Sequence, residues 1–475
     1  MNPASAHRAR SRLFGRDNGD GTLFEKVTGL EGGLRFTGRR YRPAAPTAAL
    51  REIAMYRIRT TLAALALLLA LPVFADEGGT VELLGFAGVR GGWVEGQPGW
   101  IEGGFGRLAA GGDAPGDSDL WIRGETQLGL RFEPSVSWQA KVHAVARAST
   151  ASNEGDAVGL TEAWARYRRA IGHQGELALT GGLFFFPSSQ ENIDPLWASP
   201  YTLTYSAINS WFAEEFRPLG LDAEWRSFTE QGDTWSLGAT VFGGNDTLGT
   251  LVAWRGWAMH DRLSGFNEKL PLPPVFSLDE GGSFAAQRRF STTGFGSDLD
   301  DRPGWAARAR YDRGRAFSGQ VAWVNNRGDR MLHGDEWAWN TRFMHAGGHW
   351  QMTEAAELMA EFTHGSTRIR FPGVPWVDAD FRAAYLMASI DTATGRWSLR
   401  HDRFHVEDHL QNAGWGVFND RGRALTFAWI RDIGRQSRVG IELLLLDSNR
   451  TVAAQSGFAP DTDGLSLLTE WRTRF

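Results

Sequence analysis

Apolar and polar side chains alternate with a period of two along several stretches of this chain. In Ile122–Phe132, leucines share one set of alternate positions with Phe132, and Arg123 and Arg131 fall on the other set. The stretch Trp138–Arg147 alternates in the same way. Because successive side chains of a β-strand point to opposite faces, the pattern predicts strands with one apolar and one polar face.

Segments of this kind recur through residues 76–475, and the connectors between them alternate in length. Short connectors such as Glu133–Ser137 and Asp432–Gln436 are followed by longer, irregular ones. Short turns on one side and long loops on the other are typical of an all-β, transmembrane antiparallel β-barrel. A soluble β-sandwich would also alternate, but the number and length of the segments favour the barrel. The pattern predicts about sixteen strands, near 81–94, 119–133, 138–149, 158–170, 175–187, 219–228, 234–244, 303–312, 316–327, 337–352, 356–370, 380–392, 396–408, 422–432, 437–449 and 464–475.

Aromatic residues lie at the predicted strand ends. They are Trp138, Trp235, Trp305, Phe317 and Trp397. Such positions are suited to the aromatic girdles of a barrel at the two membrane interfaces. In a soluble domain the same side chains would belong to the core.

The last predicted strand has a strongly apolar face. Leu465, Leu467 and Trp471 share that face with Phe475, the final residue. In a soluble protein an edge strand of this kind would favour aggregation. It resembles the C-terminal signature of bacterial outer-membrane proteins, and the resemblance implies recognition of Phe475 by the barrel-assembly machinery.

Composition excludes several other classes of protein. The 475 residues include 58 Gly, 21 Trp and 29 Phe but no Cys, and the mean hydropathy is −0.32. That value is too polar for a bundle of membrane helices. Without Cys the chain has no disulfide framework, thiol nucleophile or zinc ribbon.

An export signal is predicted at Met55–Ala75. Two arginines precede the apolar run Leu62–Leu71, and Val73 and Ala75 are small residues at a cleavage position. The run is shorter than the roughly 20 residues that a spanning helix needs. We therefore expect a mature protein that begins at Asp76.

Residues 1–54 precede this signal and are rich in Arg, so we expect them to be an upstream or leader segment. The outer-membrane barrel then corresponds to residues 76–475, which hold 38 basic and 50 acidic residues, a net charge of −12. This balance argues against nucleic-acid binding. We expect export through the general secretory route to the outer membrane of a Gram-negative bacterium, with outer-membrane lipids around the barrel.

One region of about 65 residues, 162–226, resembles a known family. Its motifs are E-A-W-A-R-Y-R at 162–168, G-G-L-F-F-F-P at 181–187, S-P-Y at 199–201, S-A-I-N-S-W at 206–211, E-E-F-R at 214–217 and G-L-D-A-E-W at 220–225. They resemble the phosphate-selective type of outer-membrane porin and its uncharacterised relatives. The resemblance implies a homotrimer with water-filled channels for passive diffusion of small hydrophilic solutes or anions. The chain departs from that type in having only two Lys after the signal.

The resemblance also implies that a long third loop, Ser188–Leu219, folds into the barrel and narrows the pore. The candidate constriction residues are Glu191, Asp194, Tyr201, Tyr205, Asn209, Glu214, Glu215 and Arg217. The alternative is an external loop packed on the rim. The connector near 245–302 is longer, and it is either an external cover or a second plug. Pro271, Pro273 and Pro274 should keep its middle out of regular structure.

Alternation also predicts the charged side chains that face the lumen. The basic ones are Arg123, Arg131, Lys141, Arg147, Arg166, Arg168, Arg226, Arg308, Arg310, Arg342, Arg382, Arg400, Arg472 and Arg474. The acidic ones are Glu125, Glu162, Asp222, Glu224, Glu357, Glu361, Asp402, Glu442 and Glu470. The basic excess predicts a weak preference for anions. If the two signs pair across strands, they only brace the wall.

Motifs for catalysis are missing from the sequence, since neither H-E-x-x-H nor G-x-S-x-G occurs. His401, His405 and His409 recur every four residues, but two of them fall at a predicted strand end and loop, so we predict no metal site. We expect no enzyme activity and no cofactor. Two other functions stay open: a structural or adhesive barrel without conductance, and an outer-membrane lipid hydrolase, which would need a Ser/His pair on its outer face.

Overall fold

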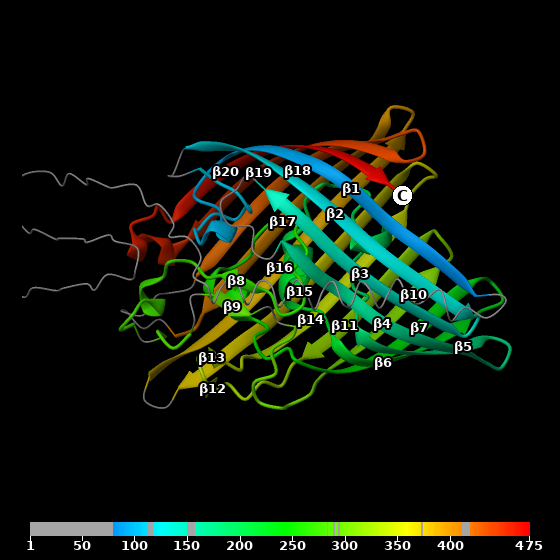
Figure 1. The fold of residues 1–475 in the computed structure, drawn as a ribbon, viewed down its shortest axis with the longest axis horizontal. Coiled ribbons are helices and arrows are strands. Elements are labelled where there is room, and N and C mark those ends of the chain that lie inside the picture. The colour runs from blue at the N-terminus through cyan, green and yellow to red at the C-terminus, as the bar shows by residue number, and fades with distance from the viewer. Residues whose placement is uncertain are drawn as a thin grey trace, which may run out of the picture. The chain divides into compact units, whose positions relative to one another are not determined.

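The computed structural model describes residues 79–112, 117–149, 157–282, 284–287, 290–292, 295–371, 374–410 and 419–475. In this part of the chain sixteen strands form one closed antiparallel barrel, in which each strand pairs with the next and β20 pairs with β1 (Figure 1). The predicted fold class is therefore confirmed. The predicted export signal lies outside the described residues.

The barrel strands follow the predicted segments closely. Their bounds are β1 Thr80–Glu95, β2 Ser118–Ser135, β3 Trp138–Ser149, β4 Val158–Ile171, β5 Gly175–Leu183, β6 Leu219–Phe228, β7 Asp233–Gly243, β10 Gly304–Arg313, β11 Phe317–Asn325, β14 Asn340–Gln351, β15 Ala356–Phe371, β16 Val374–Thr392, β17 Gly395–Asp408, β18 Asp420–Ile433, β19 Ser437–Arg450 and β20 Asp461–Arg474. No helix among the described residues is long and apolar enough to cross a membrane.

The outer surface of the barrel is mainly apolar because the alternate apolar positions point outward. Leu83, Ile122, Leu221 and Val241 are all exposed there. Aromatic pairs lie near the short turns, for example Trp138 with Tyr167 on the neighbouring strand, whose ring centroids are 5.0 Å apart. An apolar outer band with aromatic ends is the surface that a barrel presents to a lipid bilayer.

Two predicted strand bounds differ from the structure by four residues or more. β5 ends at Leu183 rather than at residue 187: the Phe184 amide still bonds to the Pro218 carbonyl, but proline has no N–H with which to continue the ladder, and Phe186 is buried among loop residues. β16 begins at Val374, six residues before the predicted start at 380. In both cases tertiary pairing, rather than local alternation, sets the end of the strand.

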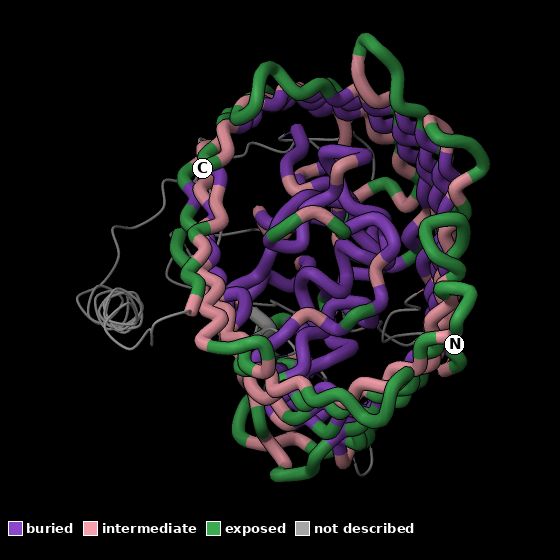
Figure 2. Tube along the Cα trace, turned by 90° about the vertical axis from the view of Figure 1, so that its right-hand side faces the viewer, coloured by how far each residue is buried: buried purple, intermediate pink, exposed green. Residues whose placement is uncertain are grey.

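Three connectors fill much of the barrel interior, and we name them by their order on the long-loop side: the first loop (96–117), the third loop (184–218) and the fourth loop (244–303). Figure 2 shows buried segments inside the ring of strands. The third loop contains η3 Pro195–Trp197 and α2 Ala207–Glu215, and the first loop contains η2 Trp100–Glu102. Together with inward side chains of the wall they form one buried apolar cluster.

The remaining elements are short. They are α3 Thr250–Trp254 and η4 Phe276–Leu278 in the fourth loop, η5 Thr451–Ser456 between β19 and β20, and the two-stranded pairs β8 Lys269–Pro271 with β9 Phe290–Thr292 and β12 Leu332–His333 with β13 Glu336–Trp337. The prediction that prolines keep the middle of the 245–302 connector irregular is therefore wrong at Pro271. Proline is tolerated at a strand end, where its missing N–H costs no ladder bond.

Candidate functional site

The third loop crosses the barrel interior and binds the opposite wall. Glu442 on β19 accepts hydrogen bonds from the Leu203 amide, at 2.6 Å, and from the Thr204 hydroxyl, also at 2.6 Å. Asp402 on β17 accepts one from the Ala207 amide at 3.1 Å. Carboxylates on the wall thus satisfy loop backbone donors that would otherwise be buried without partners.

Local sequence explains the helix in this loop. Ser206 caps α2 by accepting a hydrogen bond from the Asn209 amide, as the N-cap position favours. All nine residues of α2 are buried. The Asn209 side chain donates to Glu361 on β15 at 3.0 Å, so the helix is fixed to the wall as well as packed against it.

Arg400 on β17 is the main cationic contact of the third loop. Its guanidinium donates to the Thr204 carbonyl at 2.7 Å and to the Tyr205 carbonyl at 3.0 Å. It also lies 3.2 Å from a Glu191 oxygen and 2.8 Å from an Asp402 oxygen. The side chain is fully buried, so its charge is balanced by partners rather than by water.

The fourth loop packs on α2 and supplies charges that neutralise it. The Arg255 guanidinium donates to Glu214 at 2.9 Å, and the His260 Nε2 lies 3.0 Å from the same carboxylate. The amide of Leu251 donates to Glu215 at 2.8 Å. The fourth loop, which is the long connector near 245–302, therefore forms a plug inside the barrel where it packs on α2. This agrees with one of the two interpretations of the sequence.

The two helix carboxyls have opposite pKa shifts, one set by neighbouring groups and the other by burial. Burial tends to raise the pKa of Glu214, but the Arg255 guanidinium and the interaction with His260 outweigh it and hold the pKa at about 2. Glu215 has hydrogen bonds from the Leu251 amide and the Trp211 indole, yet burial raises its pKa to about 7. Glu214 is thus a permanent anion, whereas Glu215 changes charge near neutral pH.

Arg217 has a structural environment rather than a pore-facing one. It is fully buried and donates to the carbonyls of Thr161 at 3.1 Å and Ser264 at 2.8 Å. Its guanidinium also stacks on Phe185, 4.0 Å from the ring centroid. Burial lowers its pKa to about 9.

The other candidate constriction residues also lie inside the barrel. Asp194, which is half-buried, lies 3.0 Å from Arg438, and the Tyr201 hydroxyl donates to Glu357 at 3.0 Å. The Tyr205 amide donates to the His260 carbonyl at 2.8 Å. Seven of the eight candidates are buried, namely Glu191, Tyr201, Tyr205, Asn209, Glu214, Glu215 and Arg217.

The first loop contributes residues that the sequence did not indicate as functional. Arg107 donates to Asp420 on β18 at 2.7 Å, and the Trp257 amide of the fourth loop donates to the same carboxylate at 3.1 Å. Trp100 lies beneath Arg255, 4.4 Å from ring centroid to guanidinium carbon. An aromatic residue in a Gly-rich connector was the only sequence signal for this contact.

The loops divide the inner face of the barrel into two regions. On β15–β19, the covered wall, inward groups such as Glu361, Arg400 and Glu442 are at most 2% exposed. On β2–β4, β6 and β10, the open wall, the side chains of Arg131, Arg226 and Arg310 near the short turns are 39%, 36% and 39% exposed, whereas Arg123 and Arg147, nearer the long loops, are 2% and 5% exposed. Water therefore has access to the short-turn end of the open wall and is excluded from the middle of both walls.

Most cations of the open wall are paired. Arg308 binds Asp222 and Glu224, and Lys141 lies 2.6 Å from Glu162. The remaining pairs are Arg123 with Asp261, Arg131 with Glu82, Arg147 with Glu125, Arg226 with Glu224 and Arg310 with Asp312.

Two of the predicted lumen cations stand apart. Arg166 donates to the Thr180 hydroxyl at 2.9 Å, and within the described chain neither it nor Arg168 has a carboxylate within 4.0 Å. Both side chains are half-buried on the inner face of β4. They are the unpaired cations of the open wall.

Two predicted lumen residues point the other way. Arg342 and Arg382 are exposed on the outer surface, whereas their neighbours Phe343 and Phe381 are buried inside. These phenylalanines pack on Trp211 of α2, with ring centroids 5.1 and 5.2 Å away. Because the loops create an apolar core here, the usual arrangement of polar residues inside is reversed.

Comparisons with known proteins give structural matches only. No protein-family model matches the chain, and no curated protein does. Among the solved structures, the outer membrane channel DcaP of Acinetobacter baumannii matches 84% of this chain and 98% of its own, at 12% identity and a TM-score of 0.49. An anion-selective porin from Comamonas acidovorans matches 84% and 100%, at 12% identity and 0.46.

OmpF of Salmonella typhi, solved with daunomycin, is similar over 83% of this chain and 98% of its own, at 12% identity and a TM-score of 0.48. At such identity the likeness concerns the fold. The strand pairing described above establishes that fold by itself.

Proposed function

We propose that the protein is an outer-membrane porin, a channel for passive diffusion of small hydrophilic solutes. The observation that carries the proposal is the polar region at the short-turn end of the open wall, where charged side chains remain in contact with water. A closed barrel with an apolar outer band and a polar interior is suited to this role. The band also supports the outer membrane as its location.

Inward side chains of the open wall line a cavity that continues this polar region. Its volume is about 430 Å³, and its lining includes Glu224, Arg226, Arg308, Arg310 and Gln320. Pro187, at the start of the third loop, closes one side of it. We propose that solutes pass along this wall and that the third loop sets the narrowest point.

A weak preference for anions is part of the proposal. The carboxylates Glu191 and Glu214 of the third loop are each paired with a buried arginine, so they contribute little net field to the pore. Arg166 and Arg168 lack such partners and face the lumen. Unpaired arginines in a pore favour anions.

Planar-bilayer recording of the purified protein tests this function. We expect stable single-channel steps and a reversal potential of anionic sign at low salt. The buried cluster of loop and wall residues favours a second candidate, a structural barrel without conductance. Absence of channels from correctly folded protein would contradict the channel and leave that second candidate.

Export and assembly are proposed on the sequence signals alone. The N-terminal sequence of protein purified from outer membranes should begin at Asp76. An intact 1–54 segment on that protein would contradict the proposed export and cleavage. A homotrimer is proposed from the family resemblance, and light scattering of the detergent-solubilised protein measures it.

A further inference from the structure

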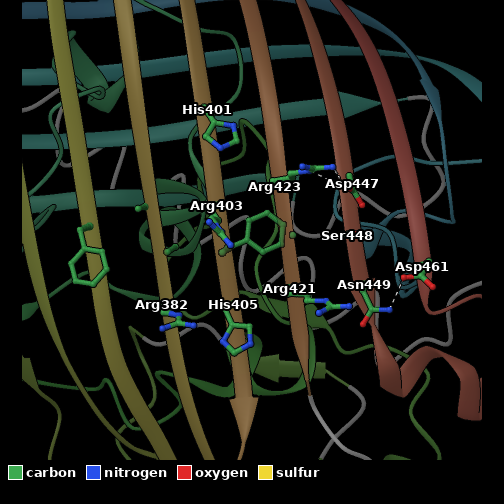
Figure 3. A pocket seen from close by; sticks show the side chains of 15 residues that line it. Arg382, His401, Arg403, His405, Arg421, Arg423, Asp447, Ser448, Asn449 and Asp461 are labelled. Atoms are coloured by element: carbon green, nitrogen blue, oxygen red, sulfur yellow. Dashed lines mark hydrogen bonds and ion pairs between the residues drawn. The ribbon is translucent and has the colours of Figure 1, made fainter.

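A group of cationic side chains lies on the outer surface of the barrel, away from the lumen. Arg382 on β16, Arg403 on β17, and Arg421 and Arg423 on β18 are all exposed. With His405 they line an open pocket of about 940 Å³, and Figure 3 shows their side chains gathered across adjacent strands. We call these five residues the outer cationic patch.

Strand register places these side chains opposite one another, with one pair of guanidinium groups face to face. Arg403 pairs with Arg423, and His405 pairs with both Arg382 and Arg421. Cross-strand side chains on one face lie about 5 Å apart, and like charges in that position are destabilising. The arrangement therefore needs an anion to balance it.

The described residues supply a carboxylate to only one of these arginines. Arg423 lies 2.8 Å from Asp447 on β19. Within the described residues Arg382, Arg403 and Arg421 have no carboxylate within 4.0 Å. Two acids lie one row nearer the long loops. His409 lies 2.9 Å from Asp380, and Glu407 is the cross-strand neighbour of Asp380. Three guanidinium groups are thus left for an external partner.

The patch also interrupts the apolar band. On β17 the outward positions are Trp397 and Leu399, and then His401 and Arg403. Six residues of strand rise about 20 Å along its axis, or about 15 Å in height at a tilt near 40°, whereas an apolar band is about 25 Å tall. Arg403 therefore stands where a barrel normally meets lipid chains or the outer headgroups.

Other strands show that this interruption is local. On β6, β7 and β10 the outward positions nearest the long loops include Leu221, Val241 and Trp305, all exposed and apolar. An arginine on the lipid-facing surface is costly unless it reaches a polar interface. Compared with β6, β7 and β10, the apolar band therefore ends farther from the long loops at β16–β18.

We infer that the outer cationic patch binds the phosphorylated headgroup of an anionic glycolipid in the outer leaflet. The inference rests on the proposed outer-membrane location but not on conductance. Guanidinium groups bind phosphate oxygens in bidentate fashion. The patch extends over three strands, about 10 Å, which suits a headgroup with more than one phosphate.

A second copy of the chain fits the patch less well. Such a partner would have to present carboxylates at its own outer surface; the outward positions of β3–β6, all in the described part, carry none, and the outward Asp380, Glu407 and Asp447 lie beside the patch itself. A symmetric contact of patch with patch would bring cations together. Charge complementarity therefore favours the lipid.

The test uses the full chain purified from outer membranes in non-ionic detergent, with binding measured by native mass spectrometry. The probes are lipopolysaccharide, the same lipopolysaccharide after removal of its phosphates, and inorganic phosphate. We expect the unaltered protein to bind the phosphorylated form at least tenfold more tightly than the dephosphorylated one. The triple variant R382Q/R403Q/R421Q should reduce that preference to less than threefold.

A matched control replaces three outward arginines at the short-turn end, as R169Q/R313Q/R431Q, and should keep the full preference. Heat-dependent gel mobility verifies that each barrel is folded. If R382Q/R403Q/R421Q fails to fold, R382K/R403K/R421K, which keeps charge but loses the planar fork, should reduce the preference about threefold.

Three results would overturn the inference. The first is equal binding of both lipopolysaccharide forms by the unaltered protein. The second is inorganic phosphate binding as tightly as the lipid, which would make the patch a free-phosphate site. The third is loss of an oligomer, rather than of lipid, in the triple variant, which would make the patch an interface between copies. Bilayer conductance should be unchanged in the variant, so a failure here is distinct from a failure of the channel proposal.

Discussion

The covered wall and the open wall carry the same kinds of charged residue but use them differently. On the covered wall Arg400, Asp402 and Glu442 bind backbone groups of the third loop and are shielded from water. On the open wall Arg226 and Arg310 pair with carboxylates of the wall itself and remain more than a third exposed. Nearer the long loops, Arg123 and Arg147 of the open wall also bind the fourth loop, so charge fixes loops on both walls and faces water at the short-turn end of the open one.

The difference shows that inward orientation alone does not make a residue part of a pore. Pairing geometry decides between the two roles, since a buried charge needs protein partners while an exposed one is screened by water and salt. Four experiments test this division, from the largest expected effect to the smallest.

Removing the cover should have the largest effect. A variant in which residues 192–214 are replaced by a short Gly-Ser linker loses α2 and exposes the covered wall to water. We expect single-channel conductance to rise at least twofold. Gel mobility verifies folding, and unchanged conductance in a folded variant would place the loop outside the solvent path.

Breaking the main cationic contact of the covered wall should affect stability more than any single change on the open wall. Arg400→Gln leaves Glu191 and Asp402 buried without their cation, and loss of one partner of a buried pair costs about 3–5 kcal/mol. Urea unfolding of the detergent-solubilised barrel measures the change in free energy. The matched control Arg166→Gln should change it by about 0.5 kcal/mol or less. Similar effects of the two would abolish the distinction between the walls.

The raised pKa of Glu215 should make stability depend on pH. Its pKa is about 7 in the folded protein, against an ordinary value of 4.5, so the folded state binds the proton more tightly than the unfolded state does. The contribution is present in full below about pH 4.5 and is lost as pH rises to about 7.

Glu215→Gln should flatten this part of the curve, because Gln keeps the neutral form at every pH. Unfolding measured at pH 5, 6 and 7 gives the slope. A variant that retains the slope of the parent protein would assign the titration to another group.

The smallest expected effect is on ion selectivity. R166Q/R168Q removes the unpaired cations of the open wall, and the reversal potential should move toward cations by a few millivolts, more at low salt because screening is weaker. R226Q is a matched control, since Arg226 is paired with Glu224. Clear cation preference in the unaltered protein would refute the role of the arginine pair.

Sequence predicted the barrel well because alternation is repeated over every strand. A one-residue error in register would have reversed each face, and at most strands the observed faces agree with the predicted ones. The exceptions, Arg342 and Arg382, lie where Phe343 and Phe381 pack on α2. Alternation alone does not show that a loop will cover the inner face at a given height.

The contents of the lumen were predicted only in outline. The third loop and its eight residues were found through the family resemblance, and the structure places them inside the barrel. The partners of those residues, such as Arg255 for Glu214 and Arg400 for Glu191, are distant in sequence and follow no periodic pattern. Long-range ion pairs depend on tertiary packing, which local sequence does not encode.

Closure of the barrel by β1 and β20 has a consequence for the time course of folding. The Phe475 amide bonds to the Gly85 carbonyl, and the Phe475 ring occupies the space where a side chain at residue 85 would stand. The seam therefore joins the first strand to the last, and the chain must bring together segments from its two extremes before either edge is satisfied. Closing so long a loop is slow, and until it is complete both edges are open to pairing with other chains. The rate of seam formation, rather than the final stability, should then determine how much of the newly synthesised chain escapes aggregation.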